Sequence, residues 1–89
     1  MIALFFKLLK NEYEILVKNA LEIKQYFLSV KEEKEYVQIE ISKNDVQEVQ
    51  LLINDEIVLN GMNEQEEVND LGRNLYKIYD EFLYQKNHQ

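Results

Sequence analysis

The stretch YVQIEIS, residues 36–42, carries the clearest structural signal in the chain. Apolar residues at 37, 39 and 41 alternate with more polar ones at 36, 38 and 40. This alternation is typical of a β-strand with one face buried. Because a lone hairpin is barely stable in water, such a strand needs further strands and a cover over its apolar face. We therefore expect residues 36–42 to lie in a small sheet packed against helices.

Upstream of this strand, residues 1–30 read as one helix. Apolar side chains recur at alternating spacings of three and four, and neither Gly nor Pro interrupts them; they are Ile2, Phe6, Leu9, Tyr13, Leu16, Ala20, Ile23, Phe27 and Val30. One continuous helix would be about 45 Å long. The alternative is a break near Asn11, which forms a capping-box pattern with Glu14. Residues 1–9 would then be a short helix, an added strand or an oligomer contact. We favour the continuous helix.

Downstream, the pattern predicts two more strands. The residues KND at 43–45 and ND at 54–55 are typical of turns. Between and after them, residues 46–53 and 56–60 read as strands. Their core faces would carry Val49, Leu51, Ile53, Ile57 and Leu59, while Leu52 and Val58 point outward, either as scattered surface residues or as part of a partner-binding face. The expected sheet is a three-stranded antiparallel meander.

The chain is expected to close with an amphipathic helix over residues 64–84. Apolar residues again recur at helical spacing, at Val68, Leu71, Leu75, Ile78, Tyr79 and Phe82. Asn63 and Glu66 suggest a capping box, Gly72 allows close packing on the sheet or a kink, and residues 85–89 look like a frayed tail. The predicted fold is one two-layer α+β domain, residues 1–89, with the order helix, three strands, helix.

The charge is unevenly distributed. The net charge is −7. Residues 1–35 carry six Lys and six acidic residues, whereas residues 36–89 carry four basic and eleven acidic residues, so the whole excess lies in the second part. Binding to phosphate backbones or anionic membranes needs Lys and Arg, which makes both unexpected. We also expect no signal peptide and no membrane span, since no apolar run is long enough.

The acidic residues between Lys43 and Arg73 are the candidate binding residues. They are Asp45, Glu48, Asp55, Glu56, Glu64, Glu66, Glu67 and Asp70. If the predicted turns and the start of the last helix lie near one another, these carboxylates form one patch that suits a basic protein surface. Tyr76 and Tyr84 are added because tyrosine is enriched at interfaces. The alternative is that the charge serves solubility alone.

Catalytic and metal chemistry find little support in the sequence. His88 is the only histidine, there is no cysteine, and only two glycines are present. No nucleophile–base set, phosphate-binding loop or calcium-loop spacing can be assembled from these residues. We therefore predict a protein that is not an enzyme and that has no cofactor and no metal site.

In size, element order and charge, the chain resembles the small acidic phage proteins that inhibit CRISPR nucleases. The resemblance implies an inhibitor that acts in the cytoplasm of a host bacterium and imitates DNA in a basic channel of its target. The sequence contains no motif that is diagnostic of this class. Two alternatives stay open. One is an immunity protein or antitoxin that neutralises a basic toxin. The other is a homo-oligomeric structural or adaptor protein that pairs through Ile2, Phe6, Leu9 and Tyr13 of the expected first helix.

Overall fold

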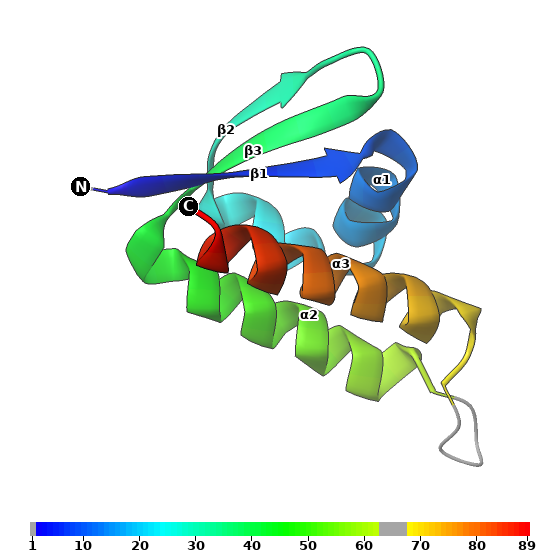
Figure 1. Ribbon diagram of the computed structural model, residues 1–89. Helices are drawn as coiled ribbons and strands as arrows, with labels where there is room; N and C mark the ends of the chain where they lie inside the picture. Colours follow the sequence, from blue (N-terminus) through cyan, green and yellow to red (C-terminus); the bar gives the residue numbers. More distant parts are fainter. Residues whose placement is uncertain (1, 63–67) are drawn as a thin grey trace.

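The computed structural model describes residues 2–62 and 68–89. In chain order its elements are β1 (Ala3–Leu9), α1 (Lys10–Asn19), the 3-10 helix η1 (Leu21–Tyr26), β2 (Phe27–Glu32), β3 (Tyr36–Ser42), the 3-10 helix η2 (Lys43–Asp45), α2 (Val46–Asn60) and α3 (Asp70–Asn87). The three strands form an antiparallel sheet in the order β1-β3-β2. Figure 1 shows α2 and α3 side by side beneath this sheet, with α1 at one end of it.

The strand predicted at residues 36–42 is confirmed as β3, the central strand of the sheet. Val37, Ile39 and Ile41 are buried on the face that the helices cover. β2 and β3 form a tight hairpin, in which the Glu33 N–H donates to the Tyr36 carbonyl oxygen at 2.8 Å. The α+β composition and the three-stranded antiparallel sheet are thus found, but the predicted order of helix, three strands and helix is wrong.

The long first helix does not exist, because residues 3–9 form β1 along the free side of β3. Phe6 and Leu8 point into the core, whereas Phe5 and Leu9 are exposed. An almost wholly apolar run fits a helical period and a strand period equally well, so neighbouring strands decide its conformation. The chain breaks one residue before Asn11: the Glu12 carboxylate accepts from the Leu9 N–H at 3.0 Å, and α1 begins at Lys10.

This correction removes the basis for pairing two copies through an N-terminal helix. Of the residues proposed for that contact, Phe6 is completely buried and Tyr13 packs against the core. Ile2 and Leu9 are exposed, but they do not share a helix face with the other two.

The two strands predicted over residues 46–60 are also wrong, since this stretch is the single helix α2. Its buried apolar residues are three or four apart, at Val46, Val49, Ile53 and Ile57. Leu51 and Leu59, which were expected in the core, are 49% and 74% exposed. Asn54 and Asp55, expected to form a turn, lie within the helix and face solvent.

The closing helix is confirmed as α3, although it begins and ends later than predicted. Leu75, Ile78 and Phe82 are fully buried on its inner side. Its N-cap is Asn69, whose side-chain oxygen accepts from the Gly72 N–H at 2.8 Å. The predicted cap at Asn63 and Glu66 lies outside the described residues. The tail predicted to fray is helical as far as Asn87.

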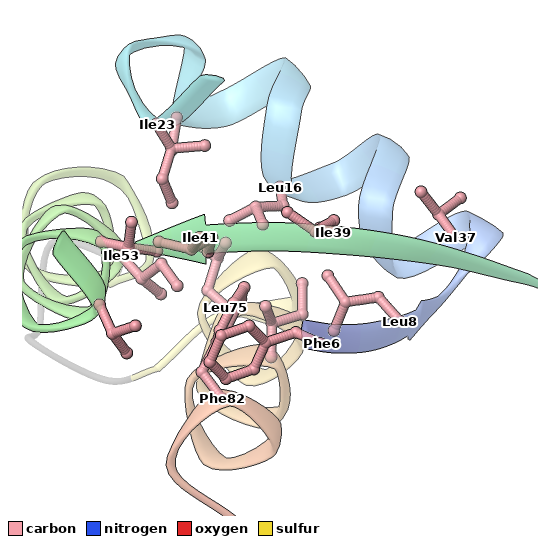
Figure 2. Packing of buried hydrophobic residues seen from close by; sticks show 14 of the residues in the cluster. Phe6, Leu8, Leu16, Ile23, Val37, Ile39, Ile41, Ile53, Leu75 and Phe82 are labelled. Carbon is pink, nitrogen blue, oxygen red and sulfur yellow. The ribbon is translucent and has the colours of Figure 1, made fainter. Parts of the chain in front are cut away.

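The core lies between the sheet and the helices. Figure 2 shows its side chains meeting from β1, α1, η1, β3, α2 and α3. At its centre the rings of Phe6 and Phe82 are 4.8 Å apart between centroids and tilted by 48°, a favourable arrangement for aromatic pairs. The core thus joins the first strand to the last helix.

Tyr13 lies at the edge of this core, and its ionisation is expected to lower the stability of the fold at alkaline pH. Burial raises the pKa of its hydroxyl, and the nearby Glu32 carboxylate raises it further. The folded state therefore favours the neutral phenol. Its contribution to the free energy of unfolding is complete below the unfolded pKa, about 10, and is lost as the pH rises through the higher folded value.

We therefore expect Tyr13→Phe to reduce the loss of stability at alkaline pH. Urea unfolding of both proteins at about pH 8 and about pH 11, on either side of the ordinary tyrosine pKa, measures this loss. The wild type should lose more stability between the two values than the variant. Equal losses would show that Tyr13 does not ionise differently on folding.

Candidate functional site

Four of the predicted acidic residues lie on one stripe of α2 and the turn before it. Asp45 ends η2, and Glu48, Asp55 and Glu56 follow within α2. A helix turns by about 100° per residue, so these four positions fall within an arc of about 100°. One edge of the stripe adjoins the buried side of α2: Glu48 and Asp55 are exposed, whereas Asp45 and Glu56 are half-buried. Helical spacing, and not the predicted meeting of hairpin turns, brings these carboxylates together. We call these four residues the acidic stripe.

The acidic stripe borders a small hollow between α2 and the start of η1. The hollow has a volume of about 140 Å³ and is lined by Ala20, Glu22, Leu52, Asp55, Glu56 and Leu59. Three carboxylates thus surround an apolar floor. Glu22 was missed by the sequence analysis, because one straight helix over residues 1–30 would carry it away from residues 46–60. Leu52, which was expected to point away from the core, is half-buried in this hollow.

Within the described residues, no carboxylate of the acidic stripe forms an ion pair. The two ion pairs found there join Lys7 to Glu33 at 3.7 Å and Arg73 to Asp70 at 2.7 Å. Glu56 accepts a hydrogen bond from the Asn60 side chain at 2.6 Å, which fixes its carboxylate without neutralising it. The stripe therefore presents uncompensated negative charge.

Helix stability does not explain the whole stripe. A helix dipole favours acidic residues near the N-terminus, by about 0.3–1 kcal/mol each, and this covers Asp45 and Glu48. Asp55 and Glu56 lie in the C-terminal half of α2, where the dipole gives them no benefit, and the last turn contains no basic residue. Their position is better explained by solubility or by binding.

Of the other predicted binding residues, those that the structure describes do not join this stripe. Asp70 is the first residue of α3, and Arg73 of the same helix turn neutralises it. Glu64, Glu66 and Glu67 lie outside the described residues. Tyr76 and Tyr84 are exposed on α3, and Tyr84 stacks on His88 with 4.1 Å between ring centroids. Of the five acids of the predicted patch that the structure describes, four therefore belong to the stripe and Asp70 does not.

The described part of the chain contains no cluster of three or more His, Asp or Glu side chains arranged to hold a metal ion. Its helices also include none that is both long and apolar enough to cross a membrane. Comparisons with models of protein families, with curated proteins and with solved structures gave no match.

Proposed function

We propose that this protein is not an enzyme and that it binds and blocks a basic surface of another protein, in the cytoplasm of a bacterial host. The observation that carries the proposal is the acidic stripe, whose four carboxylates share one helix face without an ion-pair partner among the described residues. The partner we favour is a nucleic-acid-binding protein, such as a CRISPR nuclease, whose Lys and Arg side chains normally meet phosphate.

The hollow beside the stripe suits an arginine or lysine side chain from that partner. Such a side chain has an apolar stem and a charged head. Its stem would lie on Leu52 and Leu59, while its head would meet Glu22, Asp55 or Glu56. Charge-assisted hydrogen bonds of this kind are about twice as strong as neutral ones. The remaining carboxylates of the stripe would steer the partner and set its orientation.

The spacing of the stripe limits the size of the basic surface. From Asp45 to Glu56 the helix rises by about 16 Å, so successive carboxylates are on average about 5.5 Å apart along its axis. Phosphates along one DNA strand follow each other every 3.4 Å or so. The stripe is less dense than DNA and fits a patch of a few basic residues better than a long channel. The resemblance to phage inhibitors now rests on size and charge, since the element order differs.

Reversing the charge of the acidic stripe should abolish binding to the basic partner. The variant Glu48→Lys, Asp55→Lys and Glu56→Lys is compared with a control that reverses three exposed acids elsewhere, Glu14→Lys, Glu35→Lys and Asp80→Lys. Both change the net charge equally. Each immobilised protein is exposed to a bacterial lysate and to a ten-residue polyarginine peptide at low and high salt.

We expect the stripe variant to lose at least about 100-fold in affinity for a captured partner and the control to lose less than about tenfold, with binding weaker at high salt. Equal losses would mean that total charge matters and the stripe does not. Capture of a nuclease favours the inhibitor function. Capture of a toxin, with rescue of cells that express it, favours the immunity-protein alternative.

A further inference from the structure

Side chains cover the outer edge of β1 and form hydrogen bonds with its backbone. Gln89 accepts from the Phe5 N–H at 2.9 Å and donates to the Phe5 carbonyl oxygen at 2.7 Å. Gln85 does the same at Lys7, with both distances 2.8 Å. The Leu9 N–H, next in the series, is held by Glu12. We call Gln85 and Gln89 the glutamine pair.

The glutamine pair takes the place of a neighbouring strand. A primary amide offers an acceptor and donors, as a peptide group does. Gln85 lies in the last turn of α3 and Gln89 directly after the C-cap His88. Four residues of a helix rise by about 6.0 Å and two residues of an antiparallel strand by about 6.8 Å, so a chain that continues near the helix axis brings the two amides to backbone groups two residues apart on β1. Glu81 accepts from the same Gln85 nitrogen at 2.7 Å, which orients that amide so that its oxygen faces the Lys7 N–H.

The two edge strands differ in how much they need such cover. β1 is a regular seven-residue strand, ALFFKLL, with a single charge and an unbroken register against β3. Such apolar edges readily pair with another chain. β2 is interrupted by a bulge between Phe27 and Ser29 and carries Lys31 and Glu32. Bulges and charges of this kind discourage pairing at an edge. The cover lies on the strand that lacks its own protection.

We propose that the glutamine pair keeps this protein from assembling through β1, and that release of the last turn of α3 lets β1 of a second copy add to the sheet. The second copy fits because β1 is self-complementary. In an antiparallel pair centred on Phe6, Phe5 lies opposite Lys7 of the other copy and Phe6 opposite its own equivalent. The two lysines do not face each other, and the outward backbone groups of Phe5 and Lys7 all find partners. This inference does not depend on the acidic stripe.

The test removes the amides and keeps the bulk of the side chains. The variant Gln85→Leu with Gln89→Leu is compared with Gln25→Leu and Asn54→Leu, which also places two leucines at exposed positions, on η1 and α2. Light scattering after size exclusion, over a hundredfold range of concentration, reports assembly. We expect the first variant to form dimers and larger species as its concentration rises, and the control to behave like the wild type. Assembly of both variants to the same extent, or of neither, would overturn the proposal.

A second experiment works with a variant that leaves the core untouched. Gln89→Ala changes one exposed side chain, and hydrogen exchange measured by NMR follows each amide of β1. The Phe5 amide should exchange at least about tenfold faster than in the wild type, while the Lys7 amide, still held by Gln85, should change much less. An unchanged Phe5 amide would overturn the proposal.

The pairing register has its own test. Adding Phe5→Lys to the Gln85→Leu and Gln89→Leu variant would place two lysines opposite each other in the proposed pair, so assembly should be reversed. Continued assembly of this triple variant would overturn the proposed β1 pairing.

Discussion

Replacing Phe82 with alanine is expected to lower the free energy of unfolding by about 3–5 kcal/mol. Phe82 is completely buried, and its ring packs against Phe6 in the centre of the core. The substitution removes this aromatic contact and leaves a cavity between β1 and α3. Because domains of this size are typically stable by only about 5–15 kcal/mol, the loss is a large share of the total.

Urea unfolding followed by circular dichroism measures this change. The matched control is Leu83→Ala on the same helix. Because Leu83 is 41% exposed, its truncation leaves no buried cavity. It should cost less than about 1 kcal/mol. Similar losses for both variants would show that Phe82 does not occupy the centre of the core.

Replacing Gly72 with alanine is expected to lower the free energy of unfolding by about 3 kcal/mol, at the upper end of the range for overpacking. An alanine Cβ at this position would clash with the Gly61 carbonyl oxygen and would lie 2.8 Å from Val68 Cγ1. The Gly61 oxygen also accepts from the Asn69 N–H at 2.9 Å, so the backbone cannot withdraw without losing that bond. The two glycines thus allow the end of α2 to cross the start of α3.

The sign of this effect distinguishes contact from helix propensity. Alanine is better than glycine inside a helix by about 1 kcal/mol, so propensity alone would make the variant more stable. Thermal unfolding of Gly72→Ala is compared with that of Asn74→Ala, an exposed position on the same helix that should change stability by about 0.5 kcal/mol or less. A stabilised Gly72→Ala protein would contradict the close crossing.

The sequence predicts an element correctly where its apolar residues fit only one period. The strand at residues 36–42 alternates without exception, and α3 repeats its apolar residues at helical spacing over several turns. Residues 46–60 have apolar side chains at nearly every second position as well as at every third or fourth, so the local pattern supports both structures. Packing against α3 and η1 selects the helix, and no local signal reveals that packing.

β1 was mispredicted for a different physical reason. Its conformation depends on β3, about 30 residues away, and on Gln85 and Gln89, at sequence separations of 78 and 84 residues. Apolar runs of this kind adopt the structure that distant partners allow. For the same reason, the two glutamines that hold this strand were taken for part of a frayed tail.

The binding role of the acidic residues stays a prediction, whereas the arrangement expected for them, at neighbouring turns of a sheet, was wrong. Asp45, Glu48, Asp55 and Glu56 do lie together, but on one helix face and not at the tips of neighbouring hairpins. Glu22 could not be placed beside them without knowing that α1 ends at Asn19 and that the chain turns there. Asp70 was grouped with them because it is near in sequence, but it forms an ion pair with Arg73 of its own helix turn.

The closing of the first strand by the last helix has a consequence for biosynthesis. A ribosome adds about 5–20 residues per second, so roughly 4–16 s separate the synthesis of Lys7 from that of Gln85. During that interval the most apolar strand has left, or is leaving, the exit tunnel while its covering side chains do not yet exist. Nascent chains on neighbouring ribosomes of one messenger are then close enough to pair, so slow translation of the last codons should lower the yield of native protein.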